Sequence, residues 1–368
     1  MFKIVEAEHG TVQRMPDRMF GYFSWPSVTK MDDGTLIAVA SGYRIAHICP
    51  FGKSVMTTSR DNGKTWSPLI IVGDTLIDDR DSGIINLGNG RLLLTWFSYD
   101  FRRTMPIYSK KSMNTDEYKI STCYLDYLTM KDFDMYLGSF IRLSDNNGAT
   151  WEQPFKIPVT TPHGPVILND GNLLYLGKEY KGMNSELDGK IMAYWSCDKG
   201  RTWELIGTVP IPDDTGLVCF HEPHALQLPS GKIIGLIRYQ HMEQYNKYSP
   251  FSIFSTSSED GGKTWSIAKP TGVEGSPPHL IMHSSGALVC VYGRRKYPFG
   301  EMAMISFDNG ETWEKDFVLR DDGIDSDLGY PCSVELSDGS IFTVYYQKVP
   351  GDRKCSILWT RWRLPGLT

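Results

Sequence analysis

Apolar and polar residues follow one recurring pattern along the chain: a short apolar run, a polar turn with a glycine, and a second apolar run. The six copies are MDDGTLIAVA, LGNGRLLLTW, LNDGNLLYLG, LPSGKIIGLI, HSSGALVCVY and LSDGSIFTVY. Their glycines are Gly34, Gly90, Gly171, Gly231, Gly286 and Gly339. Each copy predicts a β-hairpin, in which glycine supplies the positive φ that the turn demands.

A second pattern, Ser-x-Asp-x-Gly-x-Thr-Trp, follows five of these hairpins. Its copies cover residues 59–66, 144–151, 196–203, 258–265 and 306–313, with Asn146 in place of the aspartate in one of them. The Ser and Asp side chains can bond to turn backbone groups, and the Trp ring can pack into a neighbouring core. We expect these residues to staple a hairpin turn and to take no part in chemistry.

Two hairpins in each period give four strands, the content of one propeller blade. Six periods predict an all-β fold, a six-bladed β-propeller, with residues 1–20 supplying an outer strand to the last blade. No linker divides the chain and no helical run of convincing length is visible, so we expect a single domain over residues 1–368.

The second blade carries an insertion at about residues 99–137, which is rich in Tyr and Met. The insertion follows the second strand of its blade, and loops at that end of the strands lie on the same face as the expected site. We therefore predict a wall or lid over the substrate; the alternatives are a solvated excursion or a contact to another subunit.

Composition narrows the classes of function. Lys plus Arg is 38 and Asp plus Glu is 43, so the net charge of -5 argues against a nucleic-acid binder. No window reaches the roughly 18 apolar residues of a membrane span. Seven cysteines without a CxxC pair predict free thiols, and without HExxH or P-loop motifs we expect no metal and no cofactor. The N-terminus lacks an apolar signal-peptide core, which predicts a cytoplasmic protein, or a secreted or periplasmic one whose leader has been removed.

Strand parity also selects candidate site residues. The starts of the inner strands and the loops between the second and third strands of each blade lie on the face opposite the glycine turns, and the inner strands converge on the axis. Nine residues before the turn glycines stand Trp25, Asp81, Pro162, Glu222, Pro277 and Tyr330. Beside them, or in the loops, stand Arg44, His47, Arg80, His163, Arg238, Arg294 and Arg295. Several arginines with a Tyr, a Glu and histidines indicate recognition of a carboxylate on a sugar.

The Ser-x-Asp-x-Gly-x-Thr-Trp pattern resembles the Asp-box of the sialidase superfamily, over nearly the whole chain. In that family a Glu begins one inner strand and an Arg follows sixteen positions later, a spacing that Glu222 and Arg238 reproduce. Tyr330, which opens the last inner strand, matches the family nucleophile, and Arg294 resembles a further carboxylate-binding arginine. The resemblance implies that Glu222 accepts the Tyr330 proton while arginines hold the substrate carboxylate.

Two departures from the family pattern concern residues that the chemistry needs. The family has an Arg-Ile-Pro motif at the first inner strand, where this chain has Trp25, nineteen residues before Arg44. Arg80, from the adjacent blade, is the expected substitute. The family acid/base Asp would fall near Cys49, and His47 is the nearest titratable group. Asp79 and Asp81 are the other options for the acid/base residue.

Three functions remain open. The first is a sialidase-like glycoside hydrolase that acts on an acidic, terminal sugar of a glycan. The expected binding partner is then an acidic oligosaccharide or glycan. The second is a lyase that cleaves a uronate-containing glycan by β-elimination, with a His or Tyr as base. The histidines that favour it are His47, His163, His221, His224 and His279. The third is a non-catalytic carbohydrate-binding propeller in which Tyr330 and Trp25 stack on sugar. The sequence leaves the oligomeric state open.

Overall fold

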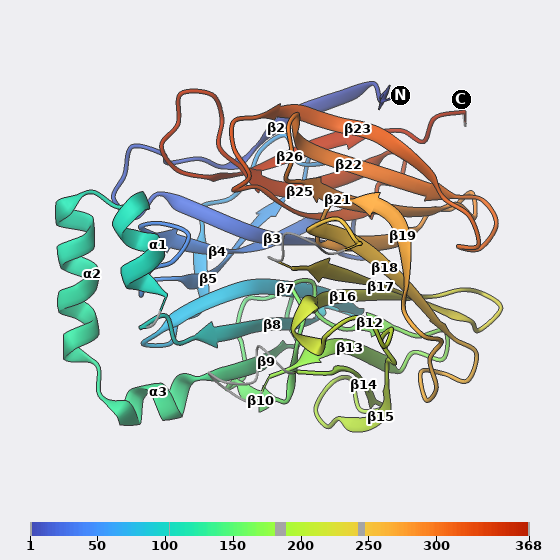
Figure 1. The fold of residues 1–368 in the computed structure, drawn as a ribbon, viewed down its shortest axis with the longest axis horizontal. Helices are drawn as coiled ribbons and strands as arrows, with labels where there is room; N and C mark the ends of the chain where they lie inside the picture. The colour runs from blue at the N-terminus through green and yellow to red at the C-terminus, as the bar shows by residue number, and fades with distance from the viewer. Residues whose placement is uncertain (1, 103, 181–188, 242–246, 367–368) are drawn as a thin grey trace.

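The computed structural model describes residues 2–102, 104–180, 189–241 and 247–366, and six antiparallel sheets make up the fold (Figure 1). Contacts between the innermost strands of the first and last blades, β3 (Tyr22–Lys30) and β24 (Gly329–Glu335), close the ring. The predicted all-β, six-bladed β-propeller of the sialidase-like type is confirmed. The expectation that no helix occurs is wrong, because the insertion is helical.

The blades follow one another in chain order. Within a blade the strand numbers increase from the axis outward, apart from the two N-terminal strands, which lie at the outer edges of the last two blades. The first and second blades consist of β3 (Tyr22–Lys30), β4 (Leu36–Arg44), β5 (Lys53–Ser59) and β6 (Ile70–Gly73), then β7 (Asp78–Gly88), β8 (Arg91–Tyr99), β9 (Gly138–Ser144) and β10 (Phe155–Ile157). The third and fourth blades consist of β11 (Val159–Thr160), β12 (Val166–Ile167), β13 (Leu173–Glu179), β14 (Ile191–Ser196) and β15 (Glu204–Thr208), then β16 (Phe220–Gln227), β17 (Ile233–Gln240), β18 (Phe251–Ser258) and β19 (Lys269–Glu274). In the third blade, both β11 and β12 pair with β13.

The last two blades use the N-terminal segment as well. They consist of β20 (Pro278–Met282), β21 (Leu288–Arg294), β22 (Phe299–Ser306) and β23 (Glu314–Gly323), then β24 (Gly329–Glu335), β25 (Ile341–Gln347) and β26 (Ser356–Trp362). Strand β1 (Lys3–Ile4) adds to β23 in parallel, and β2 (Ala7–Gln13) pairs with β26 as the outermost strand of the sixth blade. The predicted closure of the ring by the first residues of the chain is confirmed.

The Asp-box turns are stapled as the sequence predicts. In the first blade, Ser59 Oγ accepts a hydrogen bond from the Gly63 amide at 2.9 Å, and Asp61 Oδ1 accepts one from the Thr65 amide at 2.9 Å. The Trp66 indole donates to the Gly63 carbonyl at 3.0 Å. Hydrogen bonds from Thr65 and Ser59 lower the pKa of Asp61 to about 2. The other four turns repeat the bonds to the Ser and Asp or Asn side chains, so these residues hold blades and lie outside the site.

The insertion forms three helices between β8 and β9: α1 (Met105–Ser112), α2 (Thr115–Tyr127) and α3 (Met130–Tyr136). Capping boxes start two of them, one made by Asn114 with Glu117 and the other by Thr129 with Asp132. These N-x-x-E and T-x-x-D patterns are the sequence signals that predict helix starts here. None of the described helices has the length and apolar character that a membrane crossing needs.

The helices gather at one edge of the propeller (Figure 1). Met113 and Tyr118 pack against Ile45, Ala46 and Cys49, in the loop between β4 and β5. The insertion therefore supports the loop that carries His47, the position of a wall beside the expected site. Its role as a lid stays a prediction.

Candidate active site

Four inner strands share one backbone irregularity. Trp25, Asp81, Glu222 and Tyr330 have φ values of 51°, 51°, 46° and 53°, and the pairing register of each inner strand shifts at that point. A left-handed residue other than Gly or Asn is uncommon and costs on the order of 1–3 kcal/mol. All four are residues that stand nine positions before a turn glycine. We name these four residues, together with Arg238, the axial cluster.

The phenol of the sixth blade and the acid of the fourth meet. Tyr330 Oη donates a hydrogen bond to Glu222 Oε1, and Arg238 Nη1 donates to Tyr330 Oη at 3.0 Å and to Glu222 Oε2. Burial raises the pKa of Tyr330 well above its usual range; the Glu222 charge raises it further and Arg238 opposes the shift. The phenol is therefore protonated at neutral pH, with a carboxylate in position to accept its proton.

Arg295, and not Arg294, lies beside this group. The Arg295 guanidinium lies 5.7 Å from the Tyr330 ring centroid, whereas Arg294 donates to the Lys296 and Tyr297 carbonyls at 3.1 and 3.2 Å. The alternation of side chains along a strand explains why Arg295, and not Arg294, reaches the site. Arg238 stands seven residues after its turn glycine, Arg295 nine and Arg294 eight, and successive side chains of a strand point to opposite faces. The expectation that Arg294 joins the site is wrong, and counting parity would have selected Arg295.

Arg44 and Arg80 are committed to a carboxylate of the protein itself. Arg44 Nη2 donates to Asp78 Oδ2 at 2.9 Å and Arg80 Nη1 donates to the same oxygen at 3.1 Å. Both arginines also donate to the His47 carbonyl, at 2.9 and 3.0 Å. Arg44 is fully buried. The structure therefore places these two arginines as supports of the His47 loop, which differs from the substrate-binding role that the sequence predicts.

The Trp25 ring packs against Arg44, Arg80, His47 and Tyr330. The Arg80 guanidinium lies 3.9 Å from its ring centroid, and the His47 and Tyr330 ring centroids lie 5.0 and 6.2 Å away. Because Trp25 is only 1% exposed, its faces are covered by protein. It acts as a wedge that spaces the axial cluster, and the stacking of Trp25 on a sugar finds no support here.

Asp81 is a buried carboxyl group in the axial cluster. Burial raises its pKa, the negative charge of Glu222 raises it further, and Arg80 and Arg238 oppose the shift. Its Oδ1 atom is buried and makes no hydrogen bond within the described residues. Asp81 therefore keeps its proton to a higher pH than an ordinary Asp, which is a property of an acid catalyst.

His47 belongs to a network that the sequence did not reveal. Its Nδ1 lies 2.8 Å from Asp327 Oδ1, and Tyr22 Oη donates to the same oxygen at 2.9 Å. Asp327 stands three residues before Tyr330, in the loop between β23 and β24. No motif marks Asp327, Tyr22 or Asp78, although an aspartate so near the expected nucleophile was a usable signal.

His163, which the sequence predicts to bind substrate, lies in a separate group of side chains. With His224 and His279 it forms what we name the imidazole layer, in which ring centroids lie 4.8 Å (His163 to His279), 4.3 Å (His224 to His279) and 5.9 Å (His163 to His224) apart. His224 Nδ1 accepts a hydrogen bond from the Leu280 amide at 3.1 Å, and His279 Nδ1 accepts one from the Ser333 amide at 3.3 Å. These bonds join the fourth blade to the fifth and the fifth to the sixth. His163 is 4% exposed, so it supports the site from within the core.

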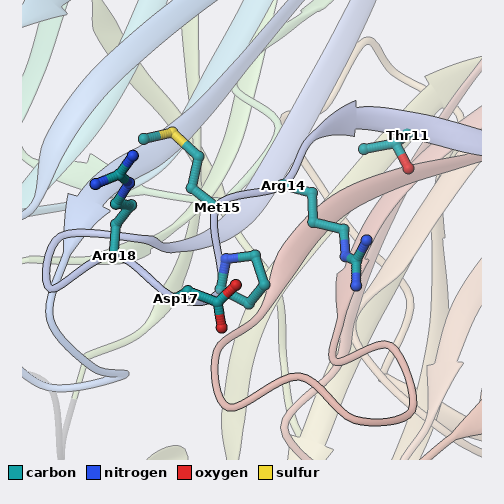
Figure 2. Close-up of a pocket in the computed structure, with 6 residues that line it drawn as sticks. Thr11, Arg14, Met15, Asp17 and Arg18 are labelled. Atoms are coloured by element: carbon teal, nitrogen blue, oxygen red, sulfur yellow. The ribbon is translucent and has the colours of Figure 1, made fainter.

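A hollow of about 500 Å³ lies at another place, in the loop between β2 and β3 (Figure 2). It is lined by Thr11, Arg14, Met15, Pro16, Asp17 and Arg18. Arg14 pairs with Asp352 at 2.7 Å. None of the lining residues belongs to the axial cluster, so the chemistry and this hollow are separate. Among the described residues, no group of three or more His, Cys, Asp or Glu side chains is arranged to hold a metal ion.

Comparisons with known proteins agree with this architecture. A family model described as BNR repeat-like domain matches residues 128–343, and one described as BNR/Asp-box repeat matches residues 57–68. No curated protein sequence matches the chain.

Among solved structures, a protein of unknown function from Dyadobacter fermentans is 21% identical with a TM-score of 0.77, over 98% of this chain and 99% of the other. The NanB sialidase from Streptococcus pneumoniae is 17% identical with a TM-score of 0.65, over 100% of this chain and 71% of the other. An α-L-arabinofuranosidase from Fusarium graminearum is 16% identical with a TM-score of 0.63, over 97% of this chain and 98% of the other. At these identities the likeness concerns the fold.

Proposed function

The chain belongs to the BNR repeat-like domain family, on a sialidase-like propeller, and from this premise we propose that it is a glycoside hydrolase that removes an acidic terminal sugar from a glycan. The observation that carries the proposal is the contact of Tyr330 with Glu222 and Arg238. A neutral phenol paired with a carboxylate is a nucleophile that a substrate carboxylate does not repel.

In this mechanism, Tyr330 Oη attacks the anomeric carbon while Glu222 takes the phenolic proton and the glycosidic C–O bond breaks. The leaving oxygen receives a proton from an acid, for which His47 and Asp81 are the candidates. Water then cleaves the tyrosyl–sugar bond, the proton of the water passes to the group that acted as acid, and Tyr330 recovers its proton from Glu222. The charge of the oxocarbenium-like transition state is offset by the negative charge that Tyr330 Oη gains as its proton moves to Glu222.

Arg295 supports the choice of an acidic sugar. Arg238 and Arg295 flank Tyr330, and each guanidinium lies 5.9 Å from the ring centroid of Phe251. Arg295 donates to the Ser326 carbonyl at 3.0 Å and forms no ion pair with a carboxylate in the described part of the chain. A guanidinium in this state can bind a substrate carboxylate with two parallel hydrogen bonds.

The second candidate is β-elimination from a uronate-containing glycan, which the His47 and Asp327 contact favours. An imidazole held by a carboxylate can abstract the proton next to the sugar carboxylate while Arg295 neutralises the charge. The two reactions give different products. Both reactions release a reducing end, because the glycosidic oxygen leaves with one fragment. Only elimination also creates an unsaturated uronate that absorbs in the ultraviolet.

A panel of acidic oligosaccharides with analysis of both products tests the proposal. We expect a reducing sugar without an unsaturated uronate from the wild type, and a loss of at least about 100-fold in turnover for Tyr330→Phe with the fold intact. Tyr345→Phe is the matched control, because Tyr345 is a buried tyrosine of the same blade whose hydroxyl lies 2.8 Å from Thr360. Retention of most activity by Tyr330→Phe would exclude the tyrosine nucleophile, and sugar binding without either product would leave a carbohydrate-binding propeller.

A further inference from the structure

We propose that Asp327 is a positioning residue that holds His47 as the proton-transferring group of the site, an inference that rests on the proposed function. Nothing in the Asp-box pattern or in the spacing of the turn glycines points to Asp327.

Asp327 is fixed by donors on several sides. Its Oδ1 lies 2.8 Å from His47 Nδ1, and Tyr22 Oη lies 2.9 and 3.0 Å from its two oxygens. Tyr346 Oη donates to Oδ1 at 3.3 Å, and Cys355 Sγ lies 3.5 Å from Oδ2. A carboxylate with this many donors has one orientation, and it passes that orientation to the imidazole.

The same loop serves the nucleophile and the acid/base group. Asp327 is three residues from Tyr330, and the Ser326 carbonyl accepts the hydrogen bond from Arg295 at 3.0 Å. His47 reaches this loop from the first blade. A short stretch of chain therefore fixes the nucleophile, a guanidinium and the imidazole in one arrangement.

The charges around His47 define its protonation. Burial lowers the pKa of His47, Arg80 and Arg44 lower it further, and Asp327 raises it. Arg44 and Arg80 share Asp78 as their counter-ion, Tyr22 Oη lies 3.1 Å from His47 Nδ1, and the Trp25 ring lies edge-on at 5.0 Å. Asp327 itself stays ionised: burial would raise its pKa, but His47, Lys348 and Tyr22 hold it far below the usual range. The net effect is a lowered His47 pKa, and Asp327 is the carboxylate that limits this fall.

With Nδ1 engaged by Asp327, the Nε2 nitrogen exchanges the proton. The His47 side chain is 38% exposed, so it is open to a substrate, unlike the buried imidazole layer. As the glycosidic C–O bond breaks, the protonated imidazole transfers the Nε2 proton to the leaving oxygen, while the proton on Nδ1 stays there and is donated in a hydrogen bond to Asp327. The neutral imidazole then takes a proton from the attacking water, which restores the starting state.

Asp327→Asn tests this pairing, because it keeps the side-chain volume and removes the charge. We expect the His47 pKa to fall, measured by NMR titration of the imidazole signals and assigned with His47→Gln. If His47 acts as an acid, the basic limb of kcat/KM moves to lower pH, and activity at pH 7.5 drops by about 100-fold or more. Asp321→Asn is the control: Asp321 is exposed on β23, and neither the titration nor the profile should move.

Tyr22→Phe provides a second variant if Asp327→Asn does not fold. Loss of the Tyr22 hydrogen bond leaves Asp327 a stronger acceptor for His47, so the His47 pKa and the basic limb should move to higher pH, opposite to Asp327→Asn. The pairing is overturned if a folded Asp327→Asn, or Tyr22→Phe in its place, keeps the wild-type titration of His47. Its catalytic role is overturned if that titration moves while activity and pH profile do not. The NMR titration needs no substrate, so it reads the pairing even if Tyr330→Phe disproves the proposed hydrolysis.

Discussion

The imidazole layer makes the stability of the protein depend on pH. A substitution of His224 isolates the contribution of that histidine. His224 is 6% exposed, its Nδ1 accepts the Leu280 amide at 3.1 Å, and burial lowers its pKa to about 4. In an unfolded chain the pKa of His is about 6.5. Between pH 6.5 and 4 the unfolded chain therefore takes up a proton that the folded chain refuses. The stabilisation is complete above pH 6.5 and is lost as the pH falls.

The magnitude follows from the difference of about 2.5 pKa units. Each unit corresponds to about 1.4 kcal/mol, so His224 withdraws about 1.4 kcal/mol of stability at pH 5.5 and about 3 kcal/mol at pH 4, relative to pH 7.5. His224→Gln removes the titration. The stability of the wild type relative to His224→Gln should therefore decrease by about 3 kcal/mol between pH 7.5 and pH 4, whatever the substitution costs at neutral pH.

Urea denaturation followed by tryptophan fluorescence at pH 7.5, 5.5 and 4 measures this difference. The wild type must be compared with the variant because Asp79 changes the stability of both in the opposite sense. Burial raises the pKa of Asp79 to about 7, so the folded chain gains a proton, and stability, as the pH falls from 7. His224→Phe is the matched control, since it also lacks the titration and should give the same pH dependence as His224→Gln. Parallel stability curves for the wild type and both variants would refute the reasoning.

Three further substitutions test which arginines bind substrate and which support the fold. Arg295→Ala should lower kcat/KM by about 30- to 100-fold, chiefly through KM, because it removes charged hydrogen bonds to the substrate, while Arg294→Ala should leave steady-state kinetics nearly unchanged; equal effects in the two variants would contradict the assignment. Asp78→Ala should destabilise the fold by about 3–5 kcal/mol in urea, because it leaves Arg44 and Arg80 buried without their shared partner, and a loss below about 1 kcal/mol would argue against that support.

The architecture was predictable because its signals are local. Each hairpin is encoded by a turn glycine between apolar runs, and each staple by an Asp-box whose bonds join residues within the same turn, such as Asp61 and Thr65. The meeting of Tyr330 and Glu222 was predictable for a related reason. Once the blades repeat, equal distances from the turn glycines place both residues at the same height along the axis.

The remaining parts of the site depend on contacts between distant segments. Asp78 and Asp327 are plain aspartates in loops, and only packing shows that one holds Arg44 and Arg80 while the other holds His47. A count of charged residues in a pit cannot distinguish an arginine that is open to substrate from one already paired. The helices between β8 and β9 were not expected because the sequence shows no helical run of convincing length there, and two capping boxes are the local signals that mark them.

The left-handed backbone at four blades explains why a repeated fold carries a single site. Trp25, Asp81, Glu222 and Tyr330 occupy the same bulge in blades one, two, four and six, so residue identity alone decides what each blade contributes there. In the third and fifth blades that position is proline, whose ring prevents a positive φ. These blades contribute His163 and His279, one and two residues further on, to the imidazole layer. The strain at the four bulges persists because the side chains that it presents are held by one another, which ties the conformation of each blade to the chemistry of the whole ring.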